Sequence, residues 1–338
     1  MKIAIYGAGS LGIVLGAFLN KAGLDAALIN HNREQVDALN SKGAHVTGLT
    51  EMTVPARAFL PEDMGDGYDL IFLLTKQLDN AAVARFLKDR LSPAGIVCTL
   101  QNGLPEEELA LILGKDRVMG CTVSWGATLE GPGVSRLTSD PKSMTFGLGP
   151  AEGPWNNKCA MVQGVLEKMC PVERVGNLKS ARWSKLLINA AFSGTGTVMG
   201  GTFGDAAKDH LSRRICLEVI QECIRVGHAS GVTFAPVQGN DIVKLMYWKN
   251  PIKKEMALAI LPVAIRKHAA IEPSMLRDLK NGRKCEINAI NGAMCAAGRK
   301  VDVPTPVNSR IVEIITRMEN GELQPGKDNL KLFGDLKL

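Results

Sequence analysis

Short apolar runs alternate with amphipathic segments through the first half of the chain. The apolar runs predict β-strands at 2–6, 25–29, 69–74, 96–100 and 117–122. Segments with an apolar residue at every third or fourth position predict helices at 10–22, 33–41, 79–90 and 105–113. This alternation is typical of an α/β domain with a doubly wound parallel sheet.

The pattern changes near residue 176. A Gly/Pro-rich stretch at 130–150 predicts a strand pair with loops, and we expect a helix at 158–170 and a strand at 172–175 to return to the sheet. Strand signals then almost vanish, and helical patterns cover 178–192, 205–230, 236–248, 252–268, 274–281, 285–298 and 305–319. We therefore expect an α/β domain at 1–175 and an all-helical domain at 176–338, with a ligand cleft between them.

Composition excludes several classes of protein. The chain of 338 residues is 46% hydrophobic and 22% charged, its longest apolar runs are too short to cross a bilayer, and its start, "KIAIYG", lacks a signal-peptide pattern. Its 40 basic and 34 acidic residues are mixed, so we expect a cytoplasmic protein with neither a membrane nor a nucleic acid as partner. The eight cysteines form no CxxC pair, which predicts reduced core thiols and no metal site.

The stretch "KIAIYGAGSLGIVLG" has a GxGxxG pattern between a predicted strand and a predicted helix. This context predicts a Rossmann-like dinucleotide site, in which the first glycine permits a tight turn, the second lets the backbone approach a pyrophosphate, and the third lets the helix pack on the strand. The helix dipole also favours phosphate there. The backbone that would hold the cofactor runs through Gly7, Ala8, Gly9, Ser10, Leu11 and Gly12. Alone, the glycines would indicate only a tight turn.

The residues after the second predicted strand, "INHNREQ", favour NADP(H). An NAD site usually places Asp or Glu at this strand end, whereas this chain has Asn30, followed by Arg33. No acid repels a 2′-phosphate, and a guanidinium can bind one bidentately. The alternative is that Arg33 is a solvated residue at a helix start.

Lys76 and Asn102 lie just beyond two more predicted strands. Because ligands of open α/β sheets bind at the carboxyl ends of strands, these loops and the glycine turn point to one crevice. Either residue alone would more simply be a polar side chain on the protein surface.

In "RWSKLLINAAFSG", Lys185, Asn189 and Ser193 recur at intervals of four in an otherwise apolar helix. At about 100° per residue, the three side chains share one stripe. A solvated face usually carries several Glu and Lys residues, so an amine, an amide and a hydroxyl in line predict the lining of a cleft.

Two residues further along complete the candidate site. Ser274 lies in the first turn of a predicted helix after Pro273, where a hydroxyl beside unpaired amides suits a carboxylate. Glu286 falls near the start of the next predicted helix, where an acid can also simply complement the helix dipole.

Five motifs together resemble the ketopantoate (2-dehydropantoate) 2-reductase family: "GAGSLG", "TKQLD", "QNG", "RWSKLLIN" and "SMLRDLKNGRKCEINAING". The resemblance covers nearly the whole chain, and the last two motifs are specific because residues and spacing both match. It implies a Rossmann domain followed by a helical domain, and NADPH-dependent reduction of ketopantoate to pantoate, as in pantothenate biosynthesis. Lys185 would protonate the ketone oxygen, with Glu286 beside nicotinamide and substrate. The other implied contacts are Asn102 with cofactor and substrate, Lys76 and Gly126 with cofactor, and Asn189 and Ser274 with substrate.

One departure leaves the substrate open. The family commonly has asparagine and proline where this chain has Ser193 and Gly194, and that asparagine helps to hold the substrate. A related dehydrogenase of another small 2-oxo or 3-hydroxy acid is therefore the alternative enzyme. A non-catalytic NADP-binding sensor is the alternative from another class, although it would not need Lys185, Asn189, Ser274 and Glu286 together. A homodimer is implied only by related folds.

Overall fold

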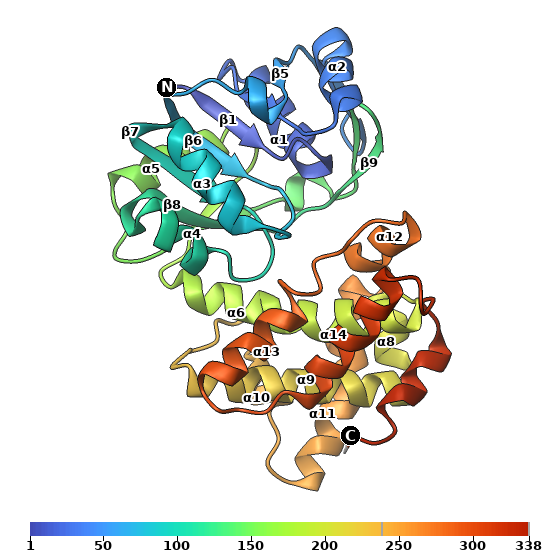
Figure 1. The fold of residues 1–338 in the computed structure, drawn as a ribbon. Coiled ribbons are helices and arrows are strands. Elements are labelled where there is room, and N and C mark those ends of the chain that lie inside the picture. The colour runs from blue at the N-terminus through green and yellow to red at the C-terminus, as the bar shows by residue number, and fades with distance from the viewer. Residues whose placement is uncertain (238, 337–338) are drawn as a thin grey trace. The chain divides into compact units, whose positions relative to one another are not determined.

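The computed structural model describes residues 1–237 and 239–336, and the chain divides into two compact units (Figure 1). The first unit comprises Met1–Gln101 and Pro105–Leu178, and the second comprises Asn102–Leu104 and Lys179–Leu338. The expected fold class, a parallel α/β sheet followed by a helical part, is confirmed.

The first unit is built on an eight-stranded sheet in the order β12-β11-β8-β7-β6-β1-β2-β5. Its strands are β1 (Ile3–Tyr6), β2 (Ala27–Ile29), β5 (Ala58–Phe59), β6 (Tyr68–Leu73), β7 (Leu91–Thr99), β8 (Val118–Val123), β11 (Phe146–Pro150) and β12 (Val172–Arg174). All neighbouring pairs are parallel except β11 with β8. Strand order reverses between β1 and β6, which is the switch point where such sheets bind ligands.

Successive residues of the central strands pack on opposite faces of this sheet. Ile5 and Phe72 belong to one apolar core, whereas Ala4 and Ile71 belong to another. Helices α1 (Ser10–Lys21), α2 (Arg33–Lys42) and α5 (Asn157–Leu166) contribute to the first core, and α3 (Asn80–Arg90) and α4 (Glu106–Leu113) to the second. Because both faces are buried, the strands read as continuous apolar runs.

A second, four-stranded sheet was not anticipated. Its order is β4-β3-β10-β9, and its strands are β3 (Ala44–Gly48), β4 (Met52–Val54), β9 (Ala127–Gly131) and β10 (Val134–Leu137). The strand pair expected within 130–150 is β9 with β10, which begins slightly earlier. Strands β3, β4 and β5 were missed because they are short and carry no pronounced apolar run, and β3 and β5 are held in their sheets by β10 and β2.

The second unit is helical: after β12 the described residues contain no further named strand (Figure 1). Its elements are α6 (Leu178–Ile188), a π-helix (Asn189–Gly194), α7 (Thr195–Met199), α8 (Phe203–Lys208), α9 (His210–Ala229), α10 (Ile242–Met246), α11 (Pro251–Ala264), α12 (Ser274–Lys280), α13 (Asn291–Lys300) and α14 (Pro306–Glu319), with short 3₁₀ turns.

Three helix predictions need correction. The predicted helix 205–230 is two helices, because the Asp209 side chain caps the start of α9. The predicted helix 285–298 begins only at Asn291, so Glu286 lies in the turns before it. Of the predicted helix 236–248, residue 238 lies outside the described residues and only α10 is helical.

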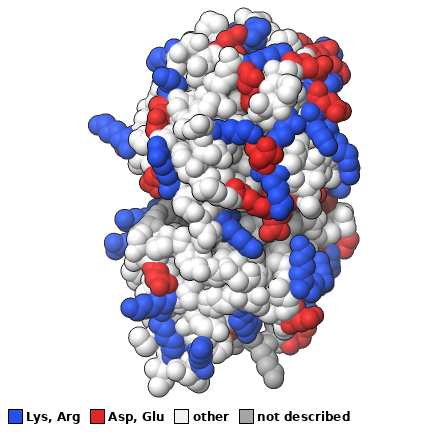
Figure 2. Space-filling model, turned by 90° about the vertical axis from the view of Figure 1, so that its left-hand side faces the viewer, with Lys and Arg blue, Asp and Glu red and all other residues white. Residues whose placement is uncertain are grey.

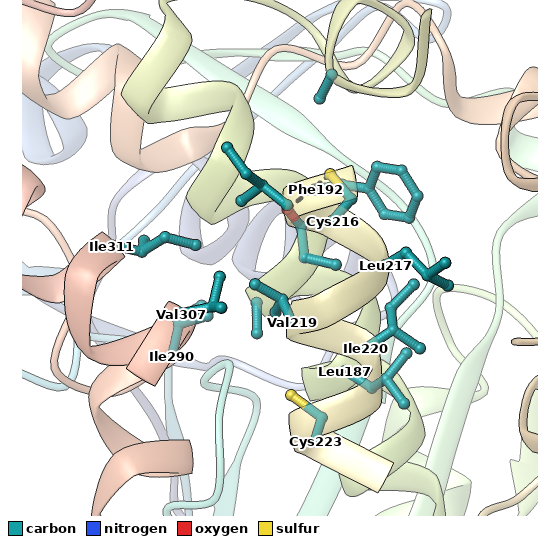
Figure 3. Packing of buried hydrophobic residues seen from close by; sticks show 14 of the residues in the cluster. Leu187, Phe192, Cys216, Leu217, Val219, Ile220, Cys223, Ile290, Val307 and Ile311 are labelled. Carbon is teal, nitrogen blue, oxygen red and sulfur yellow. Dashed lines mark hydrogen bonds between the residues drawn. The ribbon is translucent and has the colours of Figure 1, made fainter. Parts of the chain in front are cut away.

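Helix α9 lies at the centre of the apolar core of the second unit. Figure 3 shows Cys216, Leu217 and Ile220 of α9 among side chains of α14 and the π-helix. All eight cysteines of the chain are buried and free, which confirms their prediction as reduced core thiols. Burial raises the pKa of the Cys216 thiol to about 12, so this thiol stays neutral at physiological pH.

The surface carries charges of both signs. On the face drawn in Figure 2, Lys and Arg side chains are interspersed with Asp and Glu. Across the residues that the structure describes, no helix is both long and apolar enough to traverse a bilayer. Those residues also contain no His, Cys, Asp and Glu cluster suited to a metal ion.

Candidate active site

Two glycines of the turn between β1 and α1 are required by packing within the protein. Gly7 has φ of 109°, and a Cβ atom there would lie 2.6 Å from the Thr75 amide nitrogen. A Cβ atom on Gly12 would lie 2.3 Å from the Gly7 carbonyl oxygen. The turn therefore packs directly on the end of β6, and α1 packs directly on the turn.

Gly9 has a different environment. A Cβ atom there would meet nothing within 4 Å, so no neighbour in the protein requires glycine. The first turn of α1 contains no acid, and Gly9 supplies no side-chain cap to its amides. An open backbone at an uncapped, acid-free helix N-terminus fits the pyrophosphate of a dinucleotide.

The carbonyl oxygen of Ala8 accepts hydrogen bonds from two side chains that follow β2 in the sequence. Asn30 Nδ2 donates to this oxygen at 2.9 Å, and Gln35 Nε2 donates at 3.0 Å. Asn30, predicted as a cofactor contact, thus also fixes the shape of the turn. Gln35 was missed; it stands three residues after the N-cap Asn32, but its side chain is used for Ala8 instead of the cap.

Arg33 is the first residue of α2 and is exposed. A cation is disfavoured at a helix N-terminus, so helix stability does not explain this residue. Its position after the end of β2 is the place where Rossmann folds read the adenosine ribose.

The loops after β6 and β7 are tied together. Lys76 follows Thr75, the residue that contacts Gly7. Gln101 Nε2 donates to the Thr75 carbonyl oxygen at 2.9 Å. Like Gln35, Gln101 thus fixes a loop of the candidate site, although the sequence did not single it out. The next residue, Asn102, is grouped with the second unit.

Gly126 belongs to a different loop of the first unit. It follows β8, which β7 and β6 separate from β1 in the sheet. Its amide donates to Ser139 Oγ at 2.9 Å, and a Cβ atom there would lie 3.0 Å from Thr138 Oγ1. The structure therefore does not place Gly126 in the glycine turn itself.

In the second unit, the polar stripe runs from α6 into the π-helix. Lys185 lies in α6, Asn189 begins the π-helix and Ser193 is its fifth residue, buried at 6% exposure. An α-helix has 3.6 residues per turn, so a step of four overshoots one turn. A π-helix, with its i to i+5 hydrogen bonds, has more residues in each turn, so a step of four residues is slightly less than one full turn. The π-helix therefore turns Ser193 back toward the line of Lys185.

The remaining candidates lie on segments that pack against this helix. Helix α12, which begins at Ser274, packs on the π-helix and α7, and the Pro273 ring would be 2.9 Å from a Cβ atom on Gly196. Ser274 itself is exposed, whereas Glu286 is 9% exposed. Asn291 donates to the Ala190 carbonyl oxygen at 3.0 Å, which holds the segment after Glu286 against the π-helix. Helix α12, which begins at Ser274, and the start of α13, which follows Glu286, thus both pack against the π-helix.

Known proteins match the chain over nearly its whole length. The model of the family described as ketopantoate reductase PanE/ApbA matches residues 3–151, and that of its C-terminal part matches residues 177–319. A 2-dehydropantoate 2-reductase of Archaeoglobus fulgidus is 28% identical over 325 residues, which cover 95% of this chain and 98% of that protein.

Two solved structures share the fold. A PanE/ApbA family ketopantoate reductase from Ralstonia eutropha JMP134 superposes with a TM-score of 0.80 at 24% identity, covering 95% of this chain and 99% of that one. A D-mandelate dehydrogenase, in a ternary structure with NADH and anilino(oxo)acetate, also gives 0.80 at 22% identity and the same coverage. With both parts of its chain matched by the family's models, this protein belongs to the ketopantoate reductase family.

Proposed function

We propose that this protein is an NADPH-dependent reductase of a small 2-oxo acid, with ketopantoate as the leading substrate. The observation that carries the proposal is the stripe of Lys185, Asn189 and Ser193 on a helical run whose apolar side chains are mostly buried. Its membership of the ketopantoate reductase family supports the same reaction.

In this proposal the α/β domain, 1–175, binds NADPH, and the helical domain, 176–338, binds the substrate. The backbone over Gly7–Gly12 holds the pyrophosphate, and Arg33 binds the 2′-phosphate. Lys76, Asn102 and Gly126 would provide further contacts to the cofactor. When bound, NADPH supplies the hydride.

The side chains of the helical domain would handle the proton and the substrate. Reduction of a 2-oxo acid builds negative charge on the carbonyl oxygen, and the Lys185 ammonium group stabilises this charge and donates the proton. Ser274, beside the free amides of the α12 N-terminus, binds the substrate carboxylate. Asn189 and Ser193 hydrogen-bond the substrate, and Glu286 lies beside nicotinamide and substrate.

The test is the initial rate of NADPH oxidation with ketopantoate, measured beside NADH and a panel of other 2-oxo acids. We expect fast turnover with ketopantoate and a preference for NADPH. Binding of NADPH without turnover on any 2-oxo acid would overturn the reductase assignment and favour a sensor.

A second candidate, a dehydrogenase of a different 2-oxo acid, is favoured by Ser193, where the family commonly has asparagine. The shorter hydroxyl leaves room for a larger substrate side chain. The likeness to D-mandelate dehydrogenase makes an aryl 2-oxo acid the relevant panel member. If that acid is preferred, Ser193→Asn should shift kcat/KM back toward ketopantoate; an unchanged ratio would exclude Ser193 as the determinant.

A further inference from the structure

A chain of buried polar groups runs from α9 to the π-helix. It links Glu222, Asn308 and Asn291, which are 1%, 0% and 0% exposed, to the carbonyl oxygen of Ala190. The members come from α9, α14, α13 and the π-helix, so the chain joins four helical elements of the second unit. No candidate role described above uses Glu222 or Asn308.

The hydrogen bonds of this chain all run toward Glu222 or away from Asn291 Nδ2. Glu222 accepts from the amides of Val307 at 2.8 Å and Asn308 at 3.0 Å, and from Asn308 Nδ2 at 2.7 Å. All three donors are N–H groups, so both carboxyl oxygens of Glu222 act as acceptors. The Asn308 amide nitrogen therefore faces Glu222, and its oxygen faces Asn291.

The orientation of Asn291 follows from that of Asn308. Asn291 Nδ2 donates to Asn308 Oδ1 at 3.0 Å and to the Ala190 carbonyl oxygen at 3.0 Å. Both neighbours are acceptors, so the nitrogen must point toward them. The Asn291 oxygen then lies against Gly194, and among the described residues it has no hydrogen-bond partner. The contact with Ala190 thus leaves a buried oxygen unsatisfied, which suggests a functional reason for this arrangement.

Gly194 makes room for this amide. A Cβ atom there would lie 2.8 Å from Asn291 Oδ1 and 3.0 Å from Asn291 Nδ2. Asn291 therefore packs on bare backbone at the end of the π-helix, while its nitrogen binds a carbonyl near the beginning. The adjacent Ala191 carbonyl accepts from Cys216 Sγ at 3.3 Å on α9 (Figure 3). The turn that carries Asn189 and Ser193 is thus fixed from outside at successive residues.

We propose that Asn291 is a positioning residue: its amide holds the π-helical turn so that Asn189 and Ser193 line up with Lys185. Asn308 and Glu222 orient that amide in turn. The inference rests on the proposed reductase function, because Asn189 and Ser193 are substrate contacts only within it. Interactions that fix a π-turn are expected at functional sites, where such turns are frequent.

Asn291→Ala is the direct test, with Asn329→Ala as a matched control. Asn329 is also a buried asparagine, and its Nδ2 donates to the Val198 carbonyl at 3.1 Å, on the same helical run but beyond the π-helix, and to the Gln324 carbonyl at 2.8 Å. We expect Asn291→Ala to lower kcat with ketopantoate by about 10²-fold through misplacement of the substrate contacts, with the Kd for NADPH unchanged. Asn329→Ala should lower Tm and leave kcat near the wild-type value.

A double variant separates positioning from packing. In Asn291→Ala with Gly194→Ala, the new methyl group occupies space that the amide leaves, so Tm should recover relative to Asn291→Ala while kcat stays low. Recovery of kcat, or an equal loss of kcat in Asn329→Ala, would overturn the proposal.

Hydrogen–deuterium exchange separates this proposal from the proposed function. If the wild-type protein reduces no 2-oxo acid, the function fails, and exchange of the amides at 189–195 in the absence of substrate decides the structural part. Faster exchange confined to that segment in Asn291→Ala supports the anchoring role. Unchanged exchange there overturns it.

Discussion

The glycine turn of the first unit and the polar stripe of the second are built in opposite ways. The turn is one continuous segment, Gly7–Gly12, and what it offers a ligand is backbone. The stripe offers side chains, and its partners Ser274 and Glu286 come from segments far along the chain. A backbone site is specified by local sterics, whereas a side-chain site depends on the tertiary contacts that orient it.

The contacts around each region show this difference. A Cβ atom on Gly12 would clash with the nearby Gly7 carbonyl, whereas one on Gly9 would meet no protein atom within 4 Å. The π-helix, in contrast, is held through Asn291, which reaches it from another helix. Variants of the turn should therefore separate cleanly into folding and binding effects, whereas variants around the stripe should change the chemistry.

The largest effect is expected from the stripe. Lys185→Met should lower kcat about 10²–10⁴-fold, because the ketone oxygen loses its proton donor, while a fluorescence titration still shows NADPH binding. Lys179→Met is the matched control, since Lys179 is exposed on the same helix. Turnover near the wild-type rate in Lys185→Met would remove this residue from the mechanism.

The glycine turn should give two different losses from one chemical change. In Gly12→Ala the added methyl meets the Gly7 carbonyl, so the free energy of unfolding should fall by about 1–3 kcal/mol. In Gly9→Ala the methyl meets no protein atom, so stability should be kept while the Kd for NADPH rises about tenfold or more, roughly 1.4 kcal/mol. Urea unfolding measures the stability of both variants, and NADPH titration measures their Kd. Equal destabilisation of the two would contradict the different roles assigned to these glycines.

Arg33 tests whether a side chain beside the turn selects the cofactor. Arg33→Ala should reduce the preference for NADPH over NADH by about 10- to 100-fold, the equivalent of about 1.5–3 kcal/mol for hydrogen bonds between charged groups. The measurement is kcat/KM with each cofactor. Lys42→Ala, an exposed cation in the last turn of the same helix, should leave the ratio unchanged. A similar change in both variants would show general electrostatic attraction instead of recognition by Arg33.

The accuracy of the predictions from sequence also differs between features set by local pattern and features set by tertiary contacts. The central strands β1, β6 and β8 and the helices between them were predicted closely, because their burial imposes long apolar runs and clear periodicity. The turn between β1 and α1 was predicted at its place in the chain, and the packing roles of Gly7 and Gly12 are confirmed. Strands β3 and β4 were missed because they are short, and the pair joins its sheet only through the distant strand β10.

For the candidate site, the sequence predicts the stripe but not what holds it. The spacing of Lys185, Asn189 and Ser193 indicated a shared face, yet an α-helical pattern contains no sign of the π-helix. Asn291 is part of a quoted motif, but only tertiary structure places its amide on Ala190. Likewise Asn30 was predicted from its position after β2, while its hydrogen bond to Ala8 depends on how the strands pack.

The smallest effect is expected where the helical unit uses a local device. At the start of α8, Asp205 Oδ2 accepts from the Thr202 amide and hydroxyl, and the Thr202 hydroxyl accepts from the Asp205 amide. The hydrogen bond from the hydroxyl, with that from the amide, lowers the pKa of Asp205.

A carboxylate whose pKa is lower in the folded state stabilises the fold above its unfolded-state pKa and loses that contribution as pH falls through the folded-state pKa. Asp205→Ala should therefore lower the free energy of unfolding by about 0.5–1 kcal/mol at neutral pH, and by less in acid. Urea unfolding at neutral and at acid pH measures this difference in stability. The kcat should not change, because this cap, like the glycine turn, is formed by neighbouring residues. A fall in kcat would show that local elements of the helical unit cannot be separated from the stripe.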